Sequence, residues 1–109
     1  IVPDEAIARI YREVLGREPD PSGLNHYRGK WRDGWTQGQI QEDIRRSPEG
    51  REAGIRSAIT RAYRELLGRE PDPGGFATYQ RHMREQGWSE RELREAIMSG
   101  DEYRRRRSR

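Results

Sequence analysis

The chain has 109 residues, of which 30% are apolar and 38% charged, so it has the length of one domain and few residues to build a core. It contains no cysteine, which excludes disulfides and thiolate metal sites, and no apolar run approaches the roughly 20 residues of a membrane span. Positive and negative charges nearly balance, with a formal net charge of +3. Apolar residues also recur at regular spacings, which favours a folded helical domain over disorder.

The first predicted helix begins near Pro3, with Asp4 as the candidate N-cap. Apolar residues then recur at helical spacing as far as Leu15 and form one stripe. Gly16 follows directly, at the position where a left-handed residue commonly ends a helix.

A loop rich in charge and proline comes next, with the sequence GREPDPSG. It ends in Asp20-Pro21, an N-cap residue followed by proline at the first helical position, so a second helix is predicted over 21–32. Gly23 lies in the first turn of that helix, where glycine lowers helix propensity. We therefore expect a neighbouring backbone to approach Gly23 too closely for a Cβ atom.

A third helix is predicted from Thr36, which has capping-box spacing to Gln39. Ser47-Pro48-Glu49 then has the order of an N-cap, a proline and an acidic first turn. From there a long helix is predicted to Leu67, although Gly50 and Gly54 weaken its beginning.

The second half of the chain repeats the first. At a shift of 52, YREVLGREPDPSGLNHY meets YRELLGREPDPGGFATY, and from Gly87 onward the shift becomes 53. Ser89 and Glu92 repeat the capping-box spacing, and Asp101 should begin a last helix. The signature has five positions in each copy: Gly16, Arg17, Pro19, Asp20 and Gly23 in the first, and Gly68, Arg69, Pro71, Asp72 and Gly75 in the second.

The predicted fold is all-α, a small compact domain of two tandem three-helix repeats that share a long central helix. Repeat one covers residues 1–50, repeat two covers 51–103, and 104–109 form a basic tail. In such arrays each unit buries its apolar face against its neighbour.

These motifs resemble a bacterial repeat family of unknown function with an LGRxPDxxG signature, a Gly-Trp-Thr/Ser turn and a Ser-Pro-Glu start. The LGRxPD loop is also similar to the phycobilisome rod-linker domain, which is all-helical and serves assembly rather than catalysis. The second copy departs from the pattern with Ser99-Gly100-Asp101 in place of Ser47-Pro48. The resemblance implies a helical interaction module in large secreted or cell-surface proteins, and no known chemistry.

Metal and catalytic sites find little support in the residues. An EF-hand reading from Glu18 would need a bidentate Glu at its twelfth position, where Gly29 stands. His26 and His82 do not correspond between the copies, and no nucleophile elbow or HExxH motif is present. We therefore expect no enzyme, no cofactor and no metal.

The aromatic residues are the candidate ligand-binding groups, namely Trp31, Trp35 and Trp88. Exposed tryptophans could stack on sugar rings or anchor a protein partner. The alternative is that Trp31 fills the core, and that Trp35 and Trp88 each precede an N-cap and pack on Ile40 or Leu93 as a hydrophobic staple.

Nucleic acid is the third possible partner. Five arginines after Tyr103 could neutralise phosphates, but they leave residues 1–103 with a net charge of −2. The expected function is a non-catalytic interaction or assembly module, bound to a protein partner or to neighbouring domains of its parent chain. Carbohydrate binding and non-specific nucleic-acid contact through the arginine tail are the alternatives.

Overall fold

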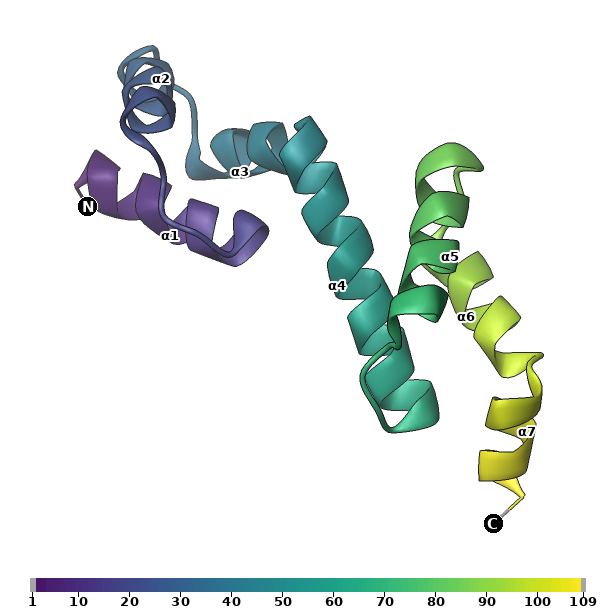
Figure 1. The fold of residues 1–109 in the computed structure, drawn as a ribbon. Coiled ribbons are helices and arrows are strands. Elements are labelled where there is room, and N and C mark those ends of the chain that lie inside the picture. The colour runs from purple at the N-terminus through teal and green to yellow at the C-terminus, as the bar shows by residue number, and fades with distance from the viewer. Residues whose placement is uncertain (1, 109) are drawn as a thin grey trace. The chain divides into compact units, whose positions relative to one another are not determined.

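The computed structural model describes residues 2–108, and every regular element in this range is a helix (Figure 1). In chain order the helices are α1 (Pro3–Leu15), α2 (Pro21–Arg32), α3 (Gln37–Arg46), α4 (Pro48–Leu67), α5 (Pro73–Glu85), α6 (Glu90–Met98) and α7 (Asp101–Arg107). The all-α prediction is confirmed. The predicted bounds of the second helix and of the long helix match α2 and α4.

The chain divides into two compact units, unit 1 (Ile1–Gly54) and unit 2 (Ile55–Arg109). Helix α4 runs without interruption through this division, despite its two glycines. None of the helices within residues 2–108 combines the length and the apolar character that a membrane span requires.

The core of unit 1 gathers the apolar stripe of α1 against α2 and α3. Its buried residues are Ile7, Ile10, Tyr11, Tyr27, Ile40 and Ile44. Trp31 and Trp35 are half-buried and pack against this cluster. Tyr11 and Tyr27 meet edge to face with ring centres 6.2 Å apart. A few large side chains therefore fill a small core.

Unit 2 repeats this core with the second half of α4 in the place of α1. Its buried residues are Ala58, Ile59, Ala62, Tyr63, Leu67, Leu93 and Ile97. Helix α5 adds only half-buried side chains, Phe76, Tyr79 and Met83, whereas α2 adds the buried Tyr27 to unit 1.

Local signals in the sequence set most of the helix ends. Gly16 and Gly68 end α1 and α4 with φ angles of 70° and 68°, in the left-handed region predicted for them. Both predicted capping boxes are present, at Thr36 and Ser89. The prediction for Asp4 is wrong, because α1 begins at Pro3, two residues before the start that an N-cap at Asp4 implies, and the residue before a proline disfavours helical backbone. The N-cap position falls on Val2.

Candidate functional site

In unit 1 the loop arginine is held from two sides. Arg17 forms a two-point ion pair with Glu49 in the first turn of α4, with Nε–Oε2 and Nη2–Oε1 distances of 2.6 and 2.7 Å. Its Cζ lies 5.3 Å from the centre of the Tyr11 ring, and Nη1 donates to the carbonyl oxygen of Glu18 at 2.9 Å. We call this set of arginine, tyrosine ring and glutamate the loop clamp. It joins α1, the loop and α4.

Unit 2 has the same clamp. Arg69 donates from Nε and Nη2 to the two carboxylate oxygens of Glu102, both at 2.8 Å, and its Cζ lies 5.1 Å from the centre of the Tyr63 ring. Glu102 lies in the first turn of α7, 53 residues after Glu49. In each unit the clamp is thus completed by the helix that follows the unit's third helix.

The clamp favours the charged forms of Arg17, Arg69 and Glu102. Hydrogen bonds to Glu49 and to Glu102 raise the pKa of Arg17 and of Arg69 above the ordinary arginine value. The hydrogen bonds from Arg69 in turn lower the pKa of Glu102. The four side chains are between 39% and 48% exposed, so water screens these pairs and their contribution to stability is small.

The remaining loop charges also contact their own unit. Arg12 binds Glu18, with Nη1 and Oε2 3.0 Å apart, and Arg64 binds Glu70, with Nε and Oε2 2.5 Å apart. Pro19 and Pro71 lie half-buried in the same loops, between the arginine and the aspartate. The charged residues of the repeated loop therefore form ion pairs that hold the corner between two helices.

The loop aspartates occupy equivalent positions but bond differently. Both have the extended backbone of an N-cap, at the start of α2 and of α5. Asp72 accepts a hydrogen bond from the Gly75 amide at 3.0 Å, and this bond lowers the pKa of its carboxyl group. Asp20 instead accepts from the Ser22 hydroxyl at 3.2 Å. Unit 2 has Gly74 at the position of Ser22, so no hydroxyl competes with the Gly75 amide for the Asp72 carboxylate.

The first-turn glycines are required by a side chain, which corrects the expectation of a close backbone. A Cβ atom on Gly23 would overlap the hydroxyl of Tyr11, and one on Gly75 would overlap that of Tyr63. In each unit one tyrosine therefore has two roles. Its ring contacts the clamp arginine, and its hydroxyl leaves no room for a Cβ atom at the first-turn glycine of the following helix.

Trp31 lines a surface hollow of unit 1 with a volume of about 330 Å³. The hollow is also lined by Asp4 and Arg28, which form a two-point ion pair at 2.5 and 2.7 Å. Hydrogen bonds from Arg28 lower the pKa of Asp4. Trp31 and one acceptor–donor pair thus share a single concave surface.

Trp35 lies half-buried beside a smaller hollow of about 250 Å³. The ammonium nitrogen of Lys30 lies 4.8 Å from the centre of its ring, a cation–π contact. Trp35 packs against the cluster that contains Ile40, as a staple would.

Trp88 stacks on His82 in unit 2, with ring centres 4.3 Å apart and an angle of 10° between the planes. His82 stands at the position of Lys30, so the second copy covers its tryptophan with an imidazole instead of an ammonium group. His82 Nδ1 lies 2.8 Å from Oε1 of Gln86. All three candidate tryptophans are half-buried, and none is freely exposed.

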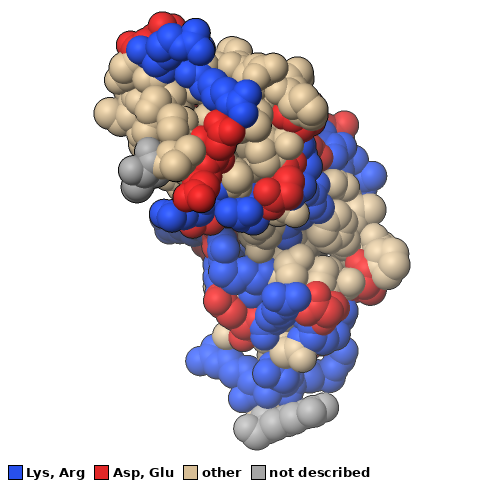
Figure 2. Space-filling model, turned by 90° about the vertical axis from the view of Figure 1, so that its left-hand side faces the viewer, with Lys and Arg blue, Asp and Glu red and all other residues tan. Residues whose placement is uncertain are grey.

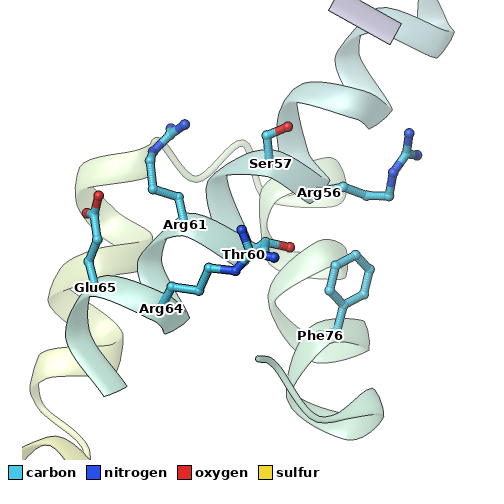
Figure 3. Close-up of a pocket in the computed structure, with 7 residues that line it drawn as sticks. All are labelled: Arg56, Ser57, Thr60, Arg61, Arg64, Glu65 and Phe76. Carbon is cyan, nitrogen blue, oxygen red and sulfur yellow. The ribbon is translucent and has the colours of Figure 1, made fainter. Parts of the chain in front are cut away.

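A larger hollow, of about 690 Å³, was not found by sequence reasoning (Figure 3). It lies in unit 2 and is lined by α4 and α5, through Arg56, Ser57, Thr60, Arg61, Arg64, Glu65 and Phe76. A signal for it was present in the repeat, because Asp4, Glu5 and Ala8 of the first copy become Arg56, Ser57 and Thr60 in the second.

The arginine tail continues α7 to Arg107, and Figure 2 shows basic side chains gathered around this end of the chain. Arg104 pairs with Asp101 at 2.8 Å, and the Arg106 guanidinium lies beside Gly68. Within residues 2–108, no three His, Asp or Glu side chains lie together as metal ligands would.

Residues 4–53 match the model of a family described as Domain of unknown function (DUF4214). This range covers most of unit 1 and the first turns of α4. Neither the comparison with curated proteins nor the comparison with solved structures found a match.

Proposed function

We propose that the chain is a non-catalytic interaction and assembly module of a larger bacterial secreted or surface protein. The support comes from the loop clamp. Glu49 completes the clamp of unit 1 from the helix that begins unit 2, and Glu102 occupies the same place for unit 2. Units of this kind can be joined end to end with one repeated contact, as in helical repeat arrays that present extended binding surfaces.

Addition of a third unit tests the modular part of the proposal. Residues 1–100 are followed directly by residues 48–109, so that Glu49 of the added segment takes the place of Glu102. We expect the added unit to be fully helical by circular dichroism and to unfold together with the others. A Glu49→Gln change in the added segment should lower the melting temperature, since it removes the new clamp.

An added unit that stays unfolded, or that melts separately at a lower temperature, contradicts the modular reading. For the assembly role, residues 1–109 are deleted from the parent protein. We expect loss of its complexes on native gels with unchanged turnover of any neighbouring catalytic domain. Retained complexes with reduced turnover contradict the proposal.

Carbohydrate binding at Trp31 is the second candidate, because the tryptophan lies beside the Asp4–Arg28 pair in one hollow. An aromatic face beside a carboxylate and a guanidinium can stack on a sugar ring and bond its hydroxyls. Trp31→Met, which installs the unit 2 residue Met83, should abolish binding of neutral oligosaccharides on a glycan array. Trp88→Ala serves as the control and should leave that signal unchanged; the reverse pattern contradicts the assignment.

A further inference from the structure

The first turn of α1 and the corresponding turn of α4 in unit 2 differ in charge. In unit 1 the positions are acidic or apolar, Asp4, Glu5 and Ala8. In unit 2 the corresponding positions on α4 carry a guanidinium and two hydroxyls, from Arg56, Ser57 and Thr60. The surrounding apolar frame is unchanged, since the next core position is isoleucine in both units, Ile7 and Ile59, fully buried in each.

The partner of this position differs as well. Asp4 is neutralised by Arg28 of α2 at 2.5 Å. The counterpart of Arg28 in α5 is Gln80, which has no charge to offer Arg56. Arg56 is exposed and forms no ion pair with any residue from 2 to 108. Its charge is therefore available at the rim of the large hollow.

The other charges of the hollow are already paired within unit 2. Arg61 binds Glu90 and Arg64 binds Glu70, at 2.7 and 2.5 Å. Glu65 accepts from Arg94 at 2.8 Å. Figure 3 shows Arg61 and Glu65 on one side of α4, and Arg56 with Phe76 on the other. The side of the hollow that faces α5 thus combines the guanidinium of Arg56, which has no ion-pair partner within residues 2–108, the hydroxyl of Thr60 and the ring of Phe76.

We propose that this side of the hollow binds a carboxylated sugar residue, such as the uronic acid of an acidic polysaccharide. Arg56 offers a planar fork that matches a carboxylate in two-point geometry. Thr60 bonds a ring hydroxyl, and the half-buried ring of Phe76 packs on the apolar face of the sugar. A bare anion would use the guanidinium alone and leave the Phe76 ring and the Thr60 hydroxyl without a role.

This ligand class is assigned to unit 2 alone. Its test does not depend on the proposed assembly role, because binding is measured on the isolated chain. The probe is trigalacturonate, titrated calorimetrically at low salt. Arg56→Gln should weaken binding by about tenfold, as expected for loss of a hydrogen bond between charged groups. Arg56→Lys keeps the positive charge but loses the planar guanidinium fork. Its affinity for trigalacturonate should therefore lie between those of the unchanged chain and Arg56→Gln. Phe76→Leu, which installs the unit 1 residue Leu24, should weaken binding severalfold.

One control variant and two control probes separate this site from general attraction to polyanions. Arg107→Asp changes the charge of an exposed arginine on α7, outside the hollow, and should alter affinity less than twofold. Triglutamate presents carboxylates without sugar rings, and neutral galactotriose presents rings without carboxylates; both should bind at least tenfold more weakly. Equal binding of triglutamate, equal loss in Arg107→Asp, or no trigalacturonate binding at millimolar concentration overturns the proposal.

Discussion

The two units keep the same loop clamp but differ in how their helices are joined elsewhere. Arg17 and Arg69 make matching contacts with a tyrosine ring and a glutamate. In unit 2, α4 and α6 are also joined by two ion pairs, Arg61–Glu90 and Glu65–Arg94. Unit 1 has glutamines, Gln37 and Gln41, at the positions of Glu90 and Arg94.

Unit 1 uses other contacts. The Tyr27 hydroxyl donates to Asp43 at 2.7 Å, and Arg28 binds Asp4. The counterparts of Asp43 and Asp4 in unit 2 are Ala96 and Arg56, which cannot accept these bonds. The comparison separates the contacts that both units have from those that only one unit has. Core positions, the clamp and the excluded Cβ recur, whereas exposed pairs vary because each contributes little.

The largest expected effect tests whether the two cores are equivalent. Ile7→Ala and Ile59→Ala each remove a fully buried side chain, so each should lower the free energy of unfolding by about 2–5 kcal/mol. Urea denaturation followed by circular dichroism measures the loss. Hydrogen exchange should show the lowered protection in the substituted unit. A loss below about 1 kcal/mol in either variant would mean that its core does not need the side chain.

The next effect concerns the tyrosine hydroxyl. Gly75→Ala should cost about 1–3 kcal/mol, because the new methyl group overlaps the hydroxyl of Tyr63. A Tyr63→Phe background should recover most of this loss. Gly74→Ala is the matched control, since its Cβ would lie 3.6 Å from the nearest atom, Oδ2 of Asp72. Equal melting temperatures for the Gly74 and Gly75 variants would exclude the overlap as the cause.

A smaller effect should distinguish the units. Tyr27→Phe leaves the Asp43 carboxylate without its hydrogen bond and should cost about 1 kcal/mol. Tyr79→Phe should cost much less, because Ala96 stands where Asp43 would be. Burial raises the pKa of Tyr27, and its bond to Asp43 raises that pKa further. Equal losses in the two variants, measured by thermal melting, would contradict this assignment.

The smallest effect is the pH dependence of the clamp. The pKa of Glu102 is lowered in the folded chain, so its pair with Arg69 stabilises fully above the unfolded-state value of about 4.3. This contribution is lost as the pH falls through the lower folded-state pKa. Because the pair is screened by water, the loss should stay below about 1 kcal/mol.

Denaturation at pH 6 and pH 3 checks this dependence. The difference in unfolding free energy between the two conditions should be smaller in Glu102→Gln than in the unchanged chain. Glu85→Gln, an exposed glutamate of α5 outside the clamp, is the control and should retain the full difference. An identical pH dependence in all three chains would remove Glu102 as a source of acid sensitivity.

Most of the fold could be predicted from the sequence because its signals are local. Apolar spacing, Gly16 and Gly68, the Thr36 and Ser89 capping boxes and the Asp-Pro helix starts depend on a few neighbouring residues. The pairing of polar side chains with one another could not be predicted in the same way. The glutamate partners of Arg17 and Arg69 lie 32 and 33 residues away along the chain.

By itself, the sequence determined that the chain is helical, that it repeats, and where most of its helices begin and end. Tertiary structure alone decided that the loop charges form ion pairs across a corner, that a hydroxyl excludes a Cβ atom at Gly23 and Gly75, and that Arg56, beside Phe76 in the large hollow, has no ion-pair partner among residues 2–108. The physical reason is how far apart along the chain the interacting residues lie. Helix ends depend on backbone hydrogen bonds within one or two turns, whereas an ion pair or a steric overlap depends on which helices pack together.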